Sequence, residues 1–159
     1  MLMDVDEELI ISFCEFDRAF FELSNKWLNE PTIKKLTMAP STTREQRLCW
    51  FETLKTRDDY RIEGIKVNGI PIGALGIKRI DYKEKTGEYF GYIGECDYIG
   101  KGLGKEMVNH AFSIAKNIGL NSLYLKVSNT NERAIRLYLK MGFVKDYCEN
   151  EIICMKVFI

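Results

Sequence analysis

The chain has 159 residues, of which 46% are hydrophobic and 29% are charged. This length and composition are typical of one globular domain with an ordinary core, so we predict a single domain over residues 1–159. Lysine plus arginine and aspartate plus glutamate both number 23, which makes the formal net charge zero. A nucleic-acid partner would require a basic stripe for phosphate contacts, and a membrane span would require an apolar run of roughly 20 residues. The sequence therefore predicts neither a nucleic-acid partner nor a membrane partner.

The five cysteines are odd in number and widely spaced, without a C-x-x-C pair. Such spacing indicates neither a zinc site nor a disulfide framework, so no metal is predicted. The first residues, Met1–Glu8, are acidic, whereas a signal peptide begins with a basic segment. Reduced thiols in a cytoplasmic protein are the simplest interpretation of both features.

The first third of the chain is predicted to be mostly helical. A short apolar run over Leu9–Phe13 predicts one initial strand, and apolar residues with a helical period over residues 18–29 predict an amphipathic helix. Two prolines divide the stretch that follows into short pieces. Thr42 with Glu45 three residues later resembles a capping box, which would begin a further helix.

Three strands are predicted next. Residues 60–67 alternate imperfectly between apolar and polar side chains, and a phase slip near Gly64 predicts a β-bulge. Asn68-Gly69 is a strong hairpin signal that joins this strand to a second one over residues 70–80. Residues 87–95 form the third predicted strand. Because no helical pattern interrupts this region, we expect an antiparallel meander.

The remainder of the chain alternates between helices and strands. Gly119 stands where a helix C-terminal cap is expected, and Asn129 with Glu132 predicts the N-terminal cap of the last helix. The predicted elements are a helix over residues 103–118, a strand over 123–127, a helix over 131–141 and strands over 143–147 and 151–158. A strand–helix–strand unit implies one parallel strand pair in an otherwise antiparallel sheet. The predicted fold class is therefore a mixed α/β sheet flanked by helices.

The junction between the third strand of the meander and the following helix carries glycines at alternate positions, Gly100, Gly102 and Gly104. Glycines allow the backbone to approach a ligand closely, and at the start of a helix the N–H groups are unpaired and lie at the positive end of the dipole. This combination predicts a phosphate-binding loop. A P-loop would place Ser or Thr after the lysine, but Glu106 follows Lys105, and the dinucleotide fingerprint G-x-G-x-x-G is not matched either.

Two segments resemble motifs of the GNAT superfamily of N-acetyltransferases. The segment Ile99–Gly104 resembles its acyl-CoA pyrophosphate loop, (Gln/Arg)-x-x-Gly-x-(Gly/Ala), although Ile99 replaces the usual Gln or Arg. The segment Asn131–Phe143 matches N-x-x-A-x-x-L-Y followed by x-x-x-G-F, which resembles the helix that flanks the pantetheine arm of acetyl-CoA. The order of predicted elements is similar to the GNAT fold over essentially the whole chain. The resemblance implies acetyl-CoA as the cofactor and a small-molecule amine as the second substrate.

The resemblance also implies which residues bind the cofactor. In the family the loop acts through its backbone amides, the Asn bonds the cofactor, and the Tyr lies beside the thioester sulfur. The cofactor-binding residues implied are Tyr92, Ile93, Gly94, Ile99, Gly100, Lys101, Gly102, Leu103, Gly104, Lys105, Asn131, Ala134 and Tyr138.

The implied reaction is direct transfer of an acetyl group from a thioester to an amine. A lysine-like amine has a pKa of about 10.4 and must be neutral to attack, so a base is needed; we name Glu88, with a water relay as an equal alternative. Backbone N–H groups beside Tyr92–Gly94 could stabilise the oxyanion if that strand separates from its neighbour. Tyr138 is the candidate proton donor to the leaving thiolate. Cys96 has no histidine partner in sequence, which argues against a covalent mechanism, and the single histidine, His110, is interpreted as a boundary residue.

The segment Lys26–Pro31 resembles GNAT enzymes that acetylate amino groups on nucleotide-linked sugars and, less specifically, those that acetylate the N-terminal residues of ribosomal proteins. Trp27, Trp50 and Tyr60 are candidates for stacking on a sugar or base, although the two tryptophans are also at core-like helical positions. The leading hypothesis is acetylation of a nucleotide-linked amino sugar. N-terminal acetylation of a protein and a non-catalytic acyl-CoA-binding module are the alternatives, and a homodimer through the edges of the last strands stays open.

Overall fold

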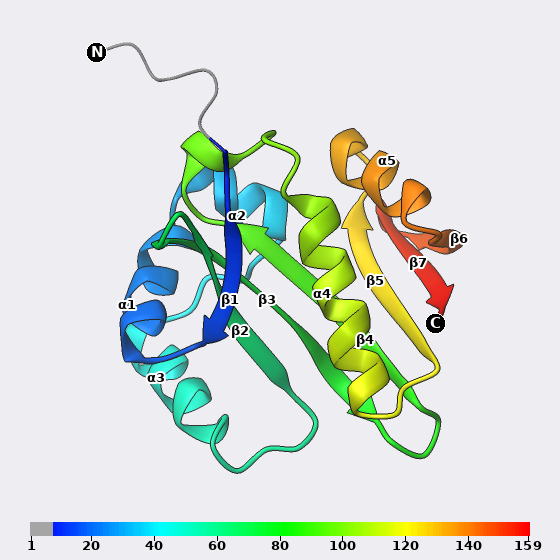
Figure 1. Ribbon diagram of the computed structural model, residues 1–159, viewed down its shortest axis with the longest axis horizontal. Coiled ribbons are helices and arrows are strands. Elements are labelled where there is room, and N and C mark those ends of the chain that lie inside the picture. Colours follow the sequence, from blue (N-terminus) through cyan, green and yellow to red (C-terminus); the bar gives the residue numbers. More distant parts are fainter. Residues whose placement is uncertain (1–7) are drawn as a thin grey trace.

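The computed structural model describes residues 8–159 (Figure 1). The cytoplasmic prediction used the acidic segment at the start of the chain, and residues 1–7 of that segment lie outside the described part. The order of strands and helices is the predicted one. The elements are β1 (Ile11–Glu15), α1 (Arg18–Trp27), α2 (Pro31–Thr37), α3 (Arg44–Thr53), β2 (Arg61–Val67), β3 (Ile70–Asp81), β4 (Thr86–Ile93), the short 3-10 helix η1 (Cys96–Tyr98), α4 (Gly104–Asn117), β5 (Ser122–Ser128), α5 (Glu132–Lys140), β6 (Val144–Glu149) and β7 (Ile152–Phe158).

Within residues 8–159, seven strands form one sheet in the order β1-β2-β3-β4-β5-β7-β6. All neighbouring strands of this described sheet are antiparallel except β4 and β5, which α4 connects. The mixed α/β fold class, the meander and the parallel pair are thus confirmed. In Figure 1, β4 and β5 run side by side at their starts and diverge towards their ends.

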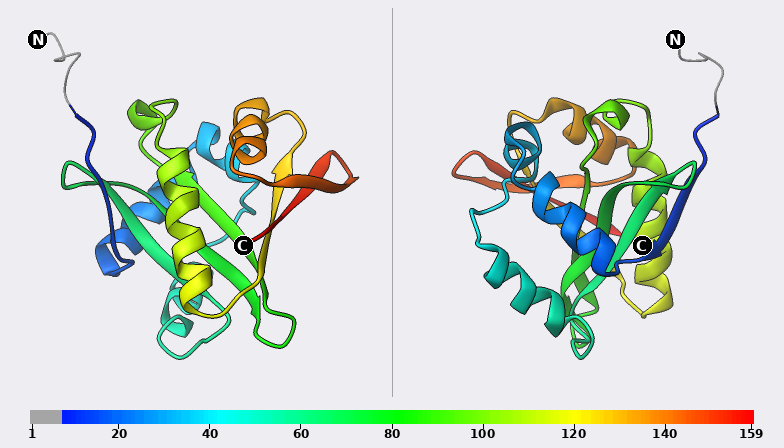
Figure 2. Two further views of the ribbon diagram at one scale, coloured as in Figure 1. Left: turned by 45° about the vertical axis from the view of Figure 1, so that its right-hand side comes forward. Right: turned by 90° about the vertical axis from the view of Figure 1, so that its left-hand side faces the viewer.

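Helices cover both faces of the sheet (Figure 2). Successive side chains of a strand point to opposite faces, and β4 shows the result. Tyr89 joins the larger hydrophobic cluster together with Met107 and Val108 of α4. Tyr92 packs instead against the smaller cluster, which contains Phe21 and other aromatic residues of α1 and α3. The strand β4 therefore separates two differently lined sides of the molecule.

The hairpin at Asn68-Gly69 is confirmed, because both residues have positive φ angles, 51° and 80°, as a two-residue primed turn requires. The register between β2 and β3 shifts at Ile65 and Lys66, not at Gly64, and the extra residue is Ile72 of β3. The glycine at position 64 has a different structural reason, because a Cβ there would lie 2.5 Å from the Phe20 ring. The phase slip in the sequence therefore marks a packing contact next to the bulge.

Three predicted boundaries are wrong by one or two residues. The capping box of α3 is formed by Thr43 and Gln46, with the Gln46 N–H donating to Thr43 Oγ1 (3.1 Å) and the Thr43 N–H donating to Gln46 Oε1 (2.9 Å). The N-cap of α5 is Asn131, not Asn129. The first strand is shifted to Ile11–Glu15, because its pairing with β2 sets its limits and not the apolar run.

Candidate functional site

A cavity of about 1730 Å³ lies where β4 and β5 separate. The two strands pair from Thr86, opposite Ser122, only as far as Glu88, opposite Tyr124. We call the part of the cavity lined by residues 99–105 and by α5 the loop end. The part lined by α2, α3 and the neighbouring side chains of β2, β3 and β4 is called the α3 end.

All the predicted site residues line this cavity except Gly94 and Lys101. Those that line it are Glu88, Tyr92, Ile93, Ile99, Gly100, Gly102, Leu103, Gly104, Lys105, Asn131, Ala134 and Tyr138. Residues that are far apart in the sequence are thus brought to one place.

The end of β4 presents backbone N–H groups to the cavity. The Gly94 N–H donates to a carbonyl oxygen of β3 (2.6 Å), so it is not available as the oxyanion donor expected from the sequence. Backbone groups alternate in direction along a strand, and the Tyr92 carbonyl oxygen also faces β3, where it lies against Gly73. The N–H groups of Gly91 and Ile93 therefore point to the side from which β5 has separated.

Trp27 and Gly94 form a packed contact away from the cavity. A Cβ at Gly94 would lie 2.2 Å from Trp27 Cγ, so only glycine fits under this ring. The Trp27 Nε1–H donates to Glu95 Oε1 (2.8 Å), and the indole is buried. Of the two alternatives for Trp27, stacking on a substrate or a core position, the structure supports the core.

The glycine loop leaves its backbone open to a ligand. Gly100 and Gly102 have left-handed φ angles of 78° and 81°, which favour glycine. Gly104 begins α4 beneath α5, where a Cβ would lie 2.5 Å from Leu137 Cδ2. The N-cap residue Leu103 makes no side-chain cap hydrogen bond, so the first N–H groups of α4 are free to bind an anion at the positive end of the helix dipole.

Arg133 adds a positive charge to this loop that the sequence analysis missed. Its guanidinium lies over Gly100, with Nη1 3.2 Å from the position that a Cβ would occupy there. Lys105 also lines the loop end. An arginine in the first turns of an amphipathic helix is indistinguishable in sequence from a solvated charge, so no local signal identifies it.

Asn131, Ala134 and Tyr138 line the cavity along one face of α5, as their spacing predicts. Asn131 Oδ1 accepts a hydrogen bond from the Ala134 N–H (3.3 Å), which caps the helix. The Asn131 Nδ2 group is therefore the part of this side chain left to donate to a ligand.

Tyr138 is held by its ring and not by its hydroxyl. The ring packs edge-on against Tyr89 and Phe143, with centroid distances of 6.2 and 5.7 Å. No hydrogen bond to the hydroxyl is formed by the residues that the structure describes. Burial raises the pKa of Tyr138 to about 12, so the hydroxyl keeps its proton at neutral pH.

Glu88 lines the cavity and is 5% exposed. Its carboxylate contacts Arg79 Nη1 at 3.1 Å and Lys78 Nζ at 3.5 Å. Arg79 has a φ angle of 51° and lies in the irregular stretch of β3 between Lys78 and Asp81. Irregularities of this kind redirect side chains, which is why the alternation of the sequence does not place Arg79 beside Glu88.

Aromatic rings line the α3 end of the cavity. Trp50 of α3 meets Tyr60 edge-on at 5.8 Å, and Tyr60 in turn lies 5.6 Å from Phe90 of β4. Burial raises the pKa of Tyr60 to about 12. Trp50 and Tyr60, both proposed from the sequence as stacking residues, are therefore lining residues of the cavity.

The remaining candidates lie elsewhere. His110 stacks on Phe13 with a centroid distance of 3.8 Å, and its Nε2 lies 3.2 Å from both carboxylate oxygens of Glu63. Cys96 is exposed. Over residues 8–159 no cluster of His, Cys, Asp and Glu could hold a metal ion, and no helix there has the length and hydrophobicity to cross a membrane.

Sequence comparison identifies relatives among acetyltransferases. The profile of the family described as Acetyltransferase (GNAT) family matches residues 21–143. An uncharacterized N-acetyltransferase of Methanocaldococcus jannaschii is 30% identical over 59% of this chain and 43% of its own length. The L-amino acid N-acyltransferase MnaT of Escherichia coli is 25% identical over 63% of this chain and 59% of its own length. The chain thus aligns with about half of the length of these curated relatives.

Solved structures share the fold at low sequence identity. The spermidine N-acetyltransferase of Vibrio cholerae, solved with CoA and spermine, has a TM-score of 0.83 at 17% identity and covers 93% of this chain and 95% of its own. The N-acetyltransferase PseH of Campylobacter jejuni has a TM-score of 0.71 at 18% identity, with 93% and 97% covered.

Proposed function

We propose, from the premise that the chain belongs to the acetyltransferase (GNAT) family, that it transfers an acetyl group from acetyl-CoA directly to a primary amine on a nucleotide-linked sugar. Acetyl-CoA is the acyl donor in this family, and it supplies the acetyl group as an activated thioester. A single domain over residues 1–159 performs this reaction in our proposal.

The loop end fits the cofactor. The free N–H groups at the start of α4, the open backbone of Gly100 and Gly102, and the guanidinium of Arg133 are suited to a diphosphate. The small side chain of Ala134 leaves room along α5 for an extended arm, and Asn131 Nδ2 is available as a donor. These residues hold the cofactor in our proposal.

Three groups of this chain are assigned to the chemistry. The N–H groups of Gly91 and Ile93 stabilise the negative charge that develops on the carbonyl oxygen. The Tyr138 hydroxyl donates a hydrogen bond to the departing sulfur. Glu88 accepts the proton of the amine, and a water relay in place of Glu88 is the equal alternative.

The observation that carries the substrate proposal is the aromatic wall of the α3 end. Trp50, Tyr60 and Phe90 offer faces and edges on which a sugar or a nucleobase can stack. A protein N-terminus would favour an open groove with acidic or polar sides. A non-catalytic cofactor-binding module would have no use for the Tyr138 hydroxyl, which lines the cavity and forms no hydrogen bond with residues 8–159.

Thioester turnover with a panel of amines tests the proposal. Nucleotide-activated amino sugars, the free amino sugars, peptides with free N-termini and spermidine are compared by release of free coenzyme A thiol. We expect the highest kcat/KM for a nucleotide-linked amino sugar. Preference for a peptide would favour the N-terminal acetyltransferase alternative, and binding of acetyl-CoA without turnover of any amine would favour the non-catalytic module.

The homodimer expected from the sequence stays a proposal. β6 is the last strand of the described sheet, and Val144 and Tyr147 on it are 63% and 52% exposed. A free edge with apolar side chains can pair with a second copy of the chain. Sedimentation equilibrium measures whether it does.

A further inference from the structure

Among residues 8–159, those that line the cavity carry an excess of positive charge, although the chain as a whole has a formal net charge of zero. The lining of the cavity contains eight lysines and arginines but two acidic residues, a difference of 8 − 2 = +6. The basic residues are Lys35, Arg47, Lys78, Arg79, Lys105, Lys126, Arg133 and Lys140, and the acidic ones are Glu88 and Glu132. The phosphates of the cofactor account for the charges at the loop end, but the α3 end also carries excess positive charge.

Arg47 is a partly buried cation of the α3 end that pairs with no acid of residues 8–159, whereas Lys35 of α2, which forms no ion pair there either, is exposed. Lys78 and Arg79 both contact Glu88, whereas no carboxylate among residues 8–159 forms an ion pair with Arg47. Its Nε–H donates to Asn25 Oδ1 and its Nη2 donates to Ser24 Oγ, each at 2.6 Å. A guanidinium carries five N–H donors, so this side chain retains donors for a further partner.

The surroundings of Arg47 hold its guanidinium in place at the cavity wall. Its Cζ lies 5.0 Å from the centre of the Trp50 ring and 5.9 Å from that of Phe21. Burial lowers its pKa, which means that the charged form is kept here at a cost in solvation. A partly buried charge of this kind is stabilised when an anion binds to it.

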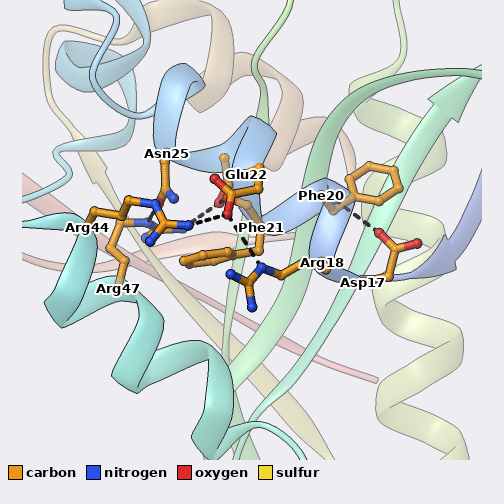
Figure 3. Close-up of polar contacts among 9 residues, drawn as sticks. Asp17, Arg18, Phe20, Phe21, Glu22, Asn25, Arg44 and Arg47 are labelled. Atoms are coloured by element: carbon orange, nitrogen blue, oxygen red, sulfur yellow. Dashed lines mark hydrogen bonds and ion pairs between the residues drawn. The ribbon is translucent and has the colours of Figure 1, made fainter.

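Arg44, one turn earlier on α3, shows that docking of α3 onto α1 does not require such an unbalanced charge. Figure 3 shows both arginines reaching from α3 to α1. Arg44 Nη2 pairs with Glu22 Oε1 at 2.5 Å, its side chain is 55% exposed, and it does not line the cavity. Arg44 therefore has the structural role alone and provides a matched control for Arg47.

We propose that Arg47 binds an anionic group, a phosphate or a carboxylate, of the amine that the enzyme acetylates. This inference rests on the proposed acetyl transfer and specifies the charge of the acceptor. The bidentate geometry of a guanidinium suits both anions. The same positive charge opposes a polycationic amine such as spermidine, because Glu88, the one acid of residues 8–159 that lines the α3 end, already contacts two cations.

Steady-state kinetics of Arg47→Gln, Arg47→Lys and Arg44→Gln with paired acceptors test this role. The pairs differ only in the anion: a nucleotide-linked amino sugar against the free amino sugar, and an α-amino acid against its amide. Loss of a charge-assisted hydrogen bond predicts a roughly ten- to hundredfold higher KM for the anionic member in Arg47→Gln. We expect a smaller rise in Arg47→Lys, less than about a threefold change in kcat, and no change in either KM in Arg44→Gln.

Binding measurements separate this inference from the proposed acetyl transfer. Uridine diphosphate and inorganic pyrophosphate are titrated by calorimetry into protein saturated with coenzyme A, so that the loop end is occupied. We expect binding that Arg47→Gln abolishes and Arg44→Gln preserves, even if no amine in the panel is acetylated. Acetate in place of the phosphate probes distinguishes a carboxylate site from a phosphate site. Equal effects of Arg47→Gln on anionic and neutral acceptors, or absence of binding by every anion, would overturn the inference.

Discussion

The substitution Tyr138→Phe isolates the contribution of one hydroxyl. Because the ring makes the packing contacts and the hydroxyl has no hydrogen-bond partner in the described structure, the variant loses no internal contact. We therefore expect the free energy of unfolding to change by less than about 0.5 kcal/mol. The dissociation constant of acetyl-CoA should also stay within about threefold of that of the unmodified protein, since the glycine loop, Asn131 and Arg133 are unchanged.

The size of the catalytic effect follows from two pKa values. The Tyr138 pKa is about 12, whereas a free thiol has a pKa of about 8.5, so full proton transfer to the thiolate is uphill by about 3.5 units, or about 5 kcal/mol. The hydroxyl should therefore stabilise the departing sulfur by a hydrogen bond and not by complete protonation. A hydrogen bond to a charged group contributes about 1.5–3 kcal/mol, which predicts a roughly 10- to 150-fold lower kcat.

The assay is release of coenzyme A thiol under saturation with both substrates, alongside thermal unfolding of the same samples. An unchanged kcat would remove the hydroxyl from the mechanism. A loss above roughly a thousandfold with intact folding would refute the hydrogen-bond argument and favour full general-acid catalysis.

Further predictions concern the two ends of the cavity and the packed contact of Gly94 with Trp27 outside it. Folding raises the pKa values of Tyr60 and Tyr138 from 10.0 to about 12. The contribution of these neutral hydroxyls to the free energy of unfolding is therefore complete below pH 10 and is lost as the pH rises through 12. The expected loss is about 3 kcal/mol for each tyrosine. Urea midpoints at pH 9 and 11.5 should show this loss, and equal midpoints would contradict it. Gly102 has a φ of 81° with open space around it, so Gly102→Ala should lower the free energy of unfolding by about 1–2 kcal/mol. The same substitution should raise the KM for acetyl-CoA, and an unchanged KM would argue against the loop as the phosphate site. Gly94→Ala forces a methyl group into the Trp27 ring, so we expect a loss of about 3 kcal/mol and a melting temperature lower by roughly 6–12 °C; calorimetry showing no shift would contradict the packing argument. Glu88→Gln should lower kcat at least about tenfold if the carboxylate is the base, and a pH–rate profile identical to that of the unmodified protein would instead favour the water relay.

Apart from Arg133, the loop end could be predicted from the sequence because its information is local. Gly100 and Gly102 encode the loop by their spacing, and Asn131, Ala134 and Tyr138 fall on one helix face by periodicity. One-residue ambiguities remained where neighbouring residues carry the same signal, as at the α3 cap, where both Thr42 and Thr43 precede an acid or amide by three positions.

The α3 end could not be predicted because it is assembled from distant segments. Arg47 and Trp50 come from α3, Tyr60 precedes β2, and Glu88 comes from β4, so their proximity depends on how the helices pack on the sheet. Arg79 is directed to Glu88 by an irregular stretch of β3 with no sequence signature. Sequence patterns give the faces of elements, but they do not give the contacts between them.

The separation of β4 from β5 has a kinetic consequence. The side chain of Tyr89 faces α4 while that of Tyr92 faces α1, so the slit between the two strands joins the two sides of the sheet. A donor held on one side and an acceptor held on the other must be present at the same moment for a group to pass between them. Initial-velocity plots at several fixed donor concentrations should therefore intersect, as in a sequential bi-substrate reaction, and parallel lines would indicate that the protein itself carries the group.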